Sequence, residues 1–271
     1  MLASSGSRRA GKTSVFTVLQ NWLKGAVLEV QEYMLLVSAA FAALVTRPYF
    51  RRDIIQQFEA IGIGSLTVVS LTGFFTGAAL ALQTGQTLDR FGARTLVGQL
   101  VSASMIRELG PVLTALMLAG RVGSGITAEL GSMAVTDQIN ALRALGTDPI
   151  RKLVVPRVLA TTMMAPVLTV IADTFSIIAG WIISVANLGV GSSTYWKAIQ
   201  DGLYLGDAWQ GLIKPFVLGF VIGTVGCHVG LRTRGGTQGV GRATTNAVVI
   251  ASVLVIAVDF FLTPLLMRLL Y

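Results

Sequence analysis

Long apolar segments alternate with short polar ones along most of this chain of 271 residues. Five of the apolar segments are long enough for a helix to cross a bilayer, which takes about 20 residues. They lie at 61–82, 96–120, 158–185, 212–231 and 247–266. Because a helix satisfies its own backbone hydrogen bonds in lipid, this pattern predicts an all-α integral membrane protein with five transmembrane helices.

A sixth apolar segment, 34–45, is too short to cross a bilayer in the same way. Glu29 and Glu32 precede it and Arg47 follows it. We therefore expect an N-terminal interfacial or re-entrant helix at this place. The expected organisation is one domain, with a basic tail and the start of an amphipathic helix at 1–26, the interfacial helix at 27–46 and a five-span core at 61–266.

The composition agrees with a membrane protein, because 53% of the residues are apolar and only 13% are charged. Soluble domains carry about 25% charged residues. The net charge of +8 does not point to nucleic acid here, since basic residues of membrane proteins gather in cytoplasmic loops. Cys227 and His228 are the only residues of their types, so neither an internal disulfide nor a closed metal site is expected.

The distribution of basic residues predicts the orientation of the chain. The connection after the second span and the one after the fourth carry Arg121, Arg143, Arg151, Lys152, Arg157, Arg232, Arg234 and Arg242. In the other two connections acidic residues offset basic ones: Asp89 opposes Arg90 and Arg94, and Asp201 and Asp207 oppose Lys197 and Lys214. The positive-inside tendency then places the N-terminus in the cytoplasm and the C-terminus outside it.

The stretch "GSRRAGKTS" at 6–14 matches the spacing of a phosphate-binding P-loop. A working P-loop follows a buried strand and opens a helix, but only the short polar run "MLASS" precedes this one. We therefore interpret it as a basic tail whose Arg8, Arg9 and Lys12 lie near anionic headgroups. Any ATP site that serves this protein is expected on another chain.

Charged residues within the apolar segments are the first candidates for function, since charges in a membrane are costly and normally face a protein interior or a watery cavity. Arg107 and Glu108 lie inside the second span, shortly before Pro111. Successive helix residues point about 100° apart, so we expect one to face a cavity and the other to pair with a neighbouring helix. Asp173 and Asp259 fit either an ion or proton site or a structural carboxylate.

The second candidate is the connection at 128–157, which is too long for a simple turn. Its apolar residues recur at helical spacing and contrast with polar neighbours. The stripe consists of Val135, Ile139, Leu142 and Leu145, and the polar residues are Asp137, Gln138, Asn140 and Arg143. Gly146 is expected to stop this helix, and Asp148 with Pro149 to start the next. Such a helix lies on the membrane or docks on a partner.

Several motifs resemble the MlaE family. The longest is "IRELGPVLTALMLAGRVGSGITAELGSM" at 106–133, and the others are "GAALALQ", "GTDPIRKLVVPR", "GVGRATTNAVV" and "DFFLT". Members of this family are permease subunits of ABC transporters that move phospholipids between the inner and outer membranes of bacteria. The similarity extends over nearly the whole chain and implies the same fold and function.

The resemblance implies a permease that works as a homodimer in the bacterial inner membrane, with a periplasmic C-terminus. It also implies three protein partners: a cytoplasmic ATPase that holds ATP and magnesium, a periplasmic MCE-domain protein that binds lipid, and a small STAS-domain protein. A coupling helix would match 129–146 and dock on the ATPase, through Glu129, Asp137, Ile139, Leu142, Arg143, Leu145 and Gly146. The permease chain itself would be no enzyme and would hold no cofactor.

By the same resemblance, a phospholipid would lie in a cavity between the two permeases. The matching positions are Leu80, Thr87, Leu88, Phe91 and Arg107. The apolar side chains would contact acyl chains and Arg107 would attract the headgroup phosphate, while Thr87 is more polar than such a lining usually is. Glu108 and Asp259 are expected to be gating or structural charges.

Three alternatives remain open from the sequence. The first is a permease that works with an MCE protein on sterols or other hydrophobic molecules. The second is a proton-coupled transporter that uses Glu108, Asp173 or Asp259. The third is a membrane scaffold that assembles partners without transport.

Overall fold

The computed structural model describes residues 15–45 and 50–270, and every regular element in this part of the chain is helical. Five helical segments are long and apolar enough to cross a membrane. They are Arg51–Asp89, Arg94–Val135, Ile150–Ala186, Leu205–Leu231 and Gly236–Leu270. Each contains one of the five apolar segments found in the sequence, so the predicted all-α, five-span architecture is confirmed.

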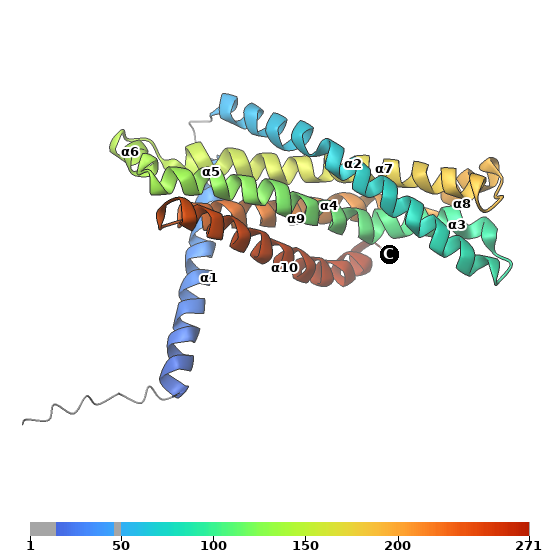
Figure 1. Ribbon diagram of the computed structural model, residues 1–271, viewed down its shortest axis with the longest axis horizontal. Coiled ribbons are helices and arrows are strands. Elements are labelled where there is room, and N and C mark those ends of the chain that lie inside the picture. Colours follow the sequence, from blue (N-terminus) through green and yellow to red (C-terminus); the bar gives the residue numbers. More distant parts are fainter. Residues whose placement is uncertain (1–14, 46–49, 271) are drawn as a thin grey trace, which may run out of the picture.

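The five segments run side by side along the long axis of a single bundle (Figure 1). The first is α2 (Arg51–Asp89), the fourth α9 (Leu205–Leu231) and the fifth α10 (Gly236–Leu270). The second is divided into η1 (Arg94–Leu96), α3 (Val97–Ser104), η2 (Met105–Leu109), α4 (Gly110–Leu118), η3 (Ala119–Gly123) and α5 (Ser124–Val135). The third consists of η4 (Ile150–Val154) and α7 (Val155–Ala186).

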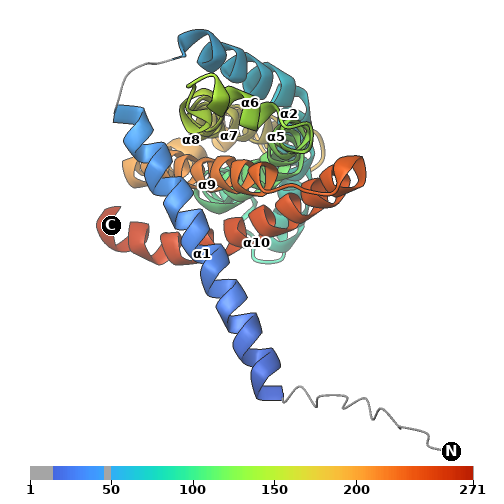
Figure 2. The same cartoon turned by 90° about the vertical axis from the view of Figure 1, so that its left-hand side faces the viewer.

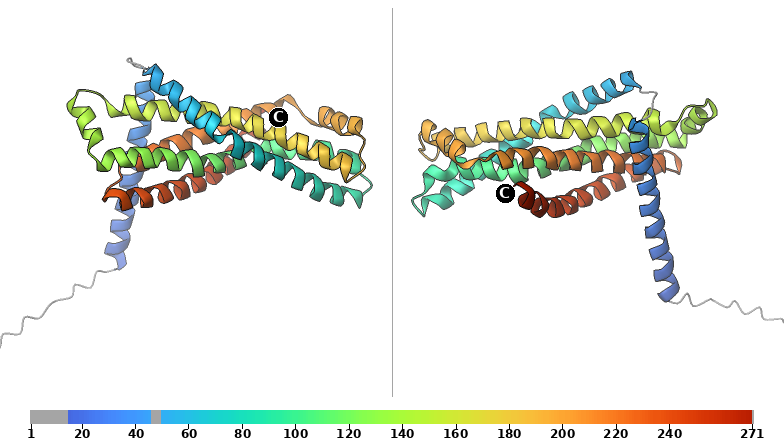
Figure 3. Two further views of the ribbon diagram at one scale, coloured as in Figure 1. Left: turned by 45° about the horizontal axis from the view of Figure 1, so that its top comes forward. Right: turned by 180° about the vertical axis from the view of Figure 1, so that it is seen from behind.

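Two short helices mark the two ends of the bundle. The helix α6 (Gln138–Ala144) lies at the end where α9 passes into α10, and α8 (Ser192–Gly202) lies at the opposite end (Figures 1 and 3). We call these the α6 end and the α8 end. The successive spans alternate in direction, so the two basic connections share the α6 end.

The helix α1 (Val15–Val45) crosses the bundle at the α6 end and extends away from it (Figures 1 and 2). It begins earlier than the helix expected at 27–46, and it is not one of the five candidate spans. It is held against α9 by Tyr33, whose hydroxyl lies 2.8 Å from the Thr224 hydroxyl, and by Phe41, whose ring centroid lies 5.2 Å from that of Phe220. The P-loop-like stretch 6–14 and Arg47 lie outside the described residues.

Glycine allows close helix contacts in the bundle. Gly73 and Gly77 of α2 face α7, and a Cβ at either position would collide with backbone atoms of Ala172 or Ser176. Gly219 of α9 likewise faces α7, where a Cβ would lie 2.8 Å from the carbonyl oxygen of Thr161. Small residues bring helix backbones together in lipid, so these glycines fix the positions of α2 and α9 on α7.

Candidate functional site

The turn η2 carries Arg107 and Glu108, the two charged residues of the apolar segment 96–120. It is a π-helical turn, and π-turns within α-helices are frequent at functional sites. The turn continues into α4, where Pro111 occupies a position in the first helical turn. Arg107 and Glu108 therefore lie at an irregular point of an otherwise long helix, and each side chain leaves it in its own direction.

Glu108 points toward a lysine from another helix. The Lys214 ammonium of α9 is fully buried and lies 2.5 Å from Oε2 of Glu108. It also lies 2.8 Å from the Thr263 hydroxyl and 3.3 Å from Oδ1 of Asp259, both on α10. The ammonium thus donates hydrogen bonds to Glu108 and Thr263 and forms an ion pair with Asp259. We call Glu108, Lys214, Asp259 and Thr263 the charge network.

Arg107 pairs with a different carboxylate. Its Nη2 donates to Oδ2 of Asp207 at 3.0 Å, and its Nε lies 2.6 Å from Oδ1, so the guanidinium and the carboxylate form a close ion pair. Oδ2 of Asp207 also accepts the backbone N–H of Tyr204 at 2.9 Å, where α9 begins. The side chain of Asp207 is almost wholly buried and that of Arg107 is 31% exposed.

Both Arg107 and Glu108 are paired, and the side chain of Arg107 stays partly exposed, so its expected place at a cavity stays a prediction. One expectation is corrected: Asp207 and Lys214 do not belong to an outer loop, because both are buried within α9. Their spacing of seven residues places them on one face of a helix, as does the spacing of four between Asp259 and Thr263. The seven-residue spacing could have placed Asp207 and Lys214 on one helix face. The balance of loop charges, which assigned both residues to an outer connection, does not use that spacing.

The charge network joins the second, fourth and fifth spans nearer to the α8 end than to the α6 end, since α9 begins at the α8 end and Lys214 lies in its first half. In a medium of low dielectric constant such pairs are strong only while their geometry is kept, and removing one partner leaves a costly charge. The arrangement can therefore hold the three spans in one relative position and release them only if the pairs exchange partners.

The remaining residues expected at a lipid cavity lie in two kinds of surroundings. Leu80 and Leu88 of α2 pack against the small buried cluster of Ala81, Val97 and Val101. Thr87 is exposed and donates to the carbonyl of Gln83 at 3.0 Å, and Phe91, just beyond α2, is 78% exposed. All four lie toward the α8 end, and their contact with lipid stays a prediction.

Asp173 lies in the middle of α7 and is buried. Its carboxylate faces Gly110 of α4 so closely that a Cβ on the glycine would collide with Oδ1. Gly110 is thus the residue that makes room for this carboxylate between the second and third spans.

The segment expected as one coupling helix at 129–146 is divided. Glu129 lies on α5, where Oε1 is 2.8 Å from Nη2 of the buried Arg157 on α7. The separate short helix is α6, and Asp137 precedes it with a left-handed backbone, φ 58°. The expected end of this helix at Gly146 is confirmed by its φ of 74°. The salt bridge of Glu129 therefore connects the start of this segment to α7, and α6 lies at the outer end of the segment.

The apolar stripe of α6 is only partly covered. Ile139 is buried and Leu142 is half-buried, whereas Leu145 is 80% exposed. Along the outer side, Asn140 donates to Asp137 at 2.9 Å and Arg143 donates to Asn140 at 3.2 Å. The expected start of the next helix is also present, because Oδ1 of Asp148 accepts the N–H of Ile150 at 2.9 Å.

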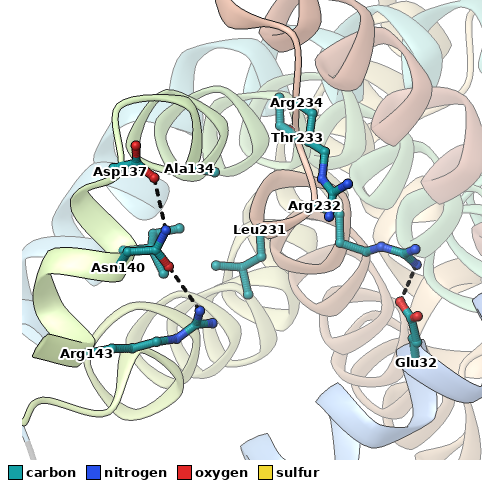
Figure 4. Close-up of a pocket in the computed structure, with 10 residues that line it drawn as sticks. Glu32, Ala134, Asp137, Asn140, Arg143, Leu231, Arg232, Thr233 and Arg234 are labelled. Atoms are coloured by element: carbon teal, nitrogen blue, oxygen red, sulfur yellow. Dashed lines mark hydrogen bonds and ion pairs between the residues drawn. The ribbon is translucent and has the colours of Figure 1, made fainter.

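A polar cleft of about 740 Å³ separates α6 from the link between α9 and α10. Asp137, Asn140 and Arg143 line one wall, and Arg232 and Arg234 line the other (Figure 4). Nη1 of Arg232 lies 2.7 Å from Oε2 of Glu32 on α1. The α6 end therefore presents an open, mainly basic surface built from three separate parts of the chain.

Comparison with known proteins decides the family. The family model described as Permease MlaE matches residues 54–265, which include the whole charge network and α6. This chain belongs to the MlaE permease family. A probable ABC transporter permease protein of Rickettsia bellii is 42% identical over 230 residues, which are 85% of this chain and 89% of that protein.

Two further relatives are named for lipids. The intermembrane phospholipid transport system permease protein MlaE of Haemophilus influenzae is 36% identical over 83% of this chain and 88% of its own length. The chloroplastic protein trigalactosyldiacylglycerol 1 of Arabidopsis thaliana is 37% identical over 78% of this chain and 61% of its own length. The expected membership in the MlaE family is thus confirmed, and this MlaE-family chain is a multi-pass membrane protein.

Proposed function

We propose that this protein is the membrane-embedded permease subunit of an ABC transporter that moves phospholipids between the inner and outer membranes of a bacterium. The observation that carries the proposal is the family match over 54–265, which spans all five transmembrane segments and the site. The name of the Haemophilus relative, a phospholipid transport permease, supports phospholipid as the cargo.

The transporting unit is a homodimer that encloses the lipid. Large apolar side chains remain exposed along α10, among them Val249, Val253, Ile256 and Phe260. Such a face is suited to lipid or to a second copy of the chain. The acyl chains contact Leu80, Leu88 and Phe91 beside Thr87. The guanidinium of Arg107 is partly exposed, and it binds the lipid phosphate when it leaves Asp207.

The energy comes from a separate cytoplasmic ATPase, which holds ATP and magnesium. The exposed Leu145 and the basic cleft beside α6 support this end as the docking surface. Closure of the ATPase pair pushes α6, and the salt bridge between Glu129 and Arg157 transmits the push to α7. The spans then shift as rigid bodies between two arrangements.

The α6 end lies in the cytoplasm and the α8 end in the periplasm. The basic connections at the α6 end support this orientation. A periplasmic MCE-domain protein then receives or delivers lipid at the α8 end, and a small STAS-domain protein binds the ATPase. The C-terminus of α10 is periplasmic.

Lipid transfer by the reconstituted complex tests the proposal. The wild type and Arg107→Ala are compared in proteoliposomes that contain the ATPase, with labelled phospholipid as cargo and mass spectrometry of the lipids that co-purify. We expect ATP-dependent transfer by the wild type and a loss of at least about tenfold for Arg107→Ala. Transfer driven by a proton gradient without the ATPase, or co-purification of sterols in place of phospholipid, contradicts the proposal. Unchanged transfer by Arg107→Ala removes Arg107 from the lipid path and favours the scaffold alternative.

A further inference from the structure

A second cavity, distinct from the charge network, lies at the α6 end between α1, α9 and α10. It is a groove of about 1070 Å³, at the upper limit of ordinary small-molecule pockets. Its lining changes character along its length. Arg232, Arg234 and Arg242 line the part near the end of the bundle, and Met34, Val225, Ile250 and Leu254 line the part that reaches into the membrane-spanning region.

Of the three arginines that line this groove, only Arg232 is paired with a carboxylate of a described residue. Nη1 of Arg232 lies 2.9 Å from Oε2 of Glu29, which also lies 3.6 Å from Nε2 of His228. The acidic residue of the lining is thus already engaged by Arg232. In the part of the chain that the structure describes, Arg234 and Arg242 form no ion pair with a carboxylate, and both are exposed. The two guanidiniums leave the mouth of the groove with an excess of positive charge.

The dimensions of the groove suit an amphiphile. Positions 242, 246, 250 and 254 succeed each other at intervals of four and form one face of α10 along the groove. A helix rises about 1.5 Å per residue, so this face extends about 18 Å from Arg242 to Leu254. That length is comparable to half of the roughly 30 Å hydrocarbon thickness of a bilayer. Asn246 adds an amide group between Arg242 and Ile250, and Gln238 lies beside the basic residues.

We propose that this groove binds one anionic phospholipid from the membrane leaflet at the α6 end, as a bound lipid and not as transported cargo. The phosphate contacts Arg234 and Arg242 beside the amide of Gln238, the amide of Asn246 meets the glycerol region, and an acyl chain lies along Ile250 and Leu254. A soluble phosphate compound shares the headgroup chemistry but leaves the apolar half of the groove empty. The bound lipid fills the gap between α1 and α10 and fastens α1 to the five-span core.

Native mass spectrometry of the purified protein from nanodiscs tests this site. Phosphatidylglycerol and phosphatidylcholine are the probes, and glycerol phosphate is added in a separate arm. We expect the wild type to retain phosphatidylglycerol in preference to phosphatidylcholine and not to retain glycerol phosphate. The double variant Arg234→Gln/Arg242→Gln should bind phosphatidylglycerol at least about tenfold more weakly, since two charge-assisted hydrogen-bonding groups are lost.

The matched control is Arg51→Gln/Arg52→Gln, which removes two exposed arginines at the same end of the molecule, at the start of α2 and outside the groove. It should retain lipid as the wild type does. Equal lipid retention by the groove variant and the wild type overturns the proposal. So does equal binding of glycerol phosphate, or a change of the groove variant from dimer to monomer without loss of lipid. Because the readout is lipid retention and not transport, these outcomes leave the proposed function untouched.

Discussion

At the scale of single residues, the most consequential side chain is Lys214. It is a fully buried ammonium, and its two carboxylate partners belong to different spans. The side chain of Asp259 is 13% exposed and that of Glu108 is 40% exposed, so the lysine is the member of the network with the least access to solvent. Its positive charge offsets the repulsion between the two carboxylates, Glu108 and Asp259, which lie close together within the bundle.

The variant Lys214→Met keeps the length of the side chain and removes its charge. We expect the free energy of unfolding in detergent to fall by about 3 kcal/mol, because Glu108 and Asp259 are left facing each other without a counter-ion. Chemical denaturation followed by circular dichroism measures the loss. The triple variant Lys214→Met/Glu108→Gln/Asp259→Asn should recover most of it. A stability of the single variant equal to that of the wild type would show that the network contributes nothing.

At the scale of helices, the contact between α2 and α7 depends on two glycines one turn apart. The variant Gly77→Leu places a side chain where the backbone of Ser176 already lies. We expect a loss of at least about 2 kcal/mol of stability, since the helices must separate. The control Ala79→Leu lies on the exposed side of α2 and should stay within about 0.5 kcal/mol of the wild type. Denaturation of both proteins in the same detergent decides between them, and equal losses would refute the packing argument.

The helix α6 gives a second prediction at this scale. Leu145 is 80% exposed at its end, and Leu205 is 78% exposed at the opposite end of the bundle. If α6 docks on the ATPase, Leu145→Asp should leave the fold intact and lower the co-purification of the ATPase at least about tenfold, as expected for an interface anchor. Leu205→Asp should retain the ATPase. Equal retention by both variants, measured by quantitative pull-down, would exclude α6 from the interface.

The helices also show how far the sequence could predict this molecule. The five spans followed from apolar length, and the end of α6 followed from Gly146, because both are local properties. The pairing of Lys214 with Glu108 and Asp259 was not local, since it needs the relative rotation of three helices. The division of 129–146 could not be predicted for a related reason. It occurs at Asp137, whose left-handed backbone conformation does not follow from the presence of a polar residue at this position.

At the scale of the whole molecule, the bundle is longer than a bilayer is thick. The helix α2 has 39 residues and α10 has 35, which correspond to about 58 and 52 Å. A bilayer with its headgroups measures about 40–45 Å. Both helices are therefore longer than the bilayer, and their ends reach the headgroup region or extend beyond it. This places α6, its cleft and Arg143 where a soluble partner can reach them.

The orientation of the bundle is the prediction that unites these features. Asn140 on α6 and Ser193 on α8 are both exposed, and they lie at opposite ends. Cys227 is buried, so it gives little background in a thiol-labelling experiment. In intact spheroplasts, a maleimide that cannot cross membranes should label Ser193→Cys and spare Asn140→Cys, and permeabilisation should expose both. The reverse pattern would place α6 in the periplasm, away from any source of ATP, and neither the coupling role of α6 nor the proposed function could then stand.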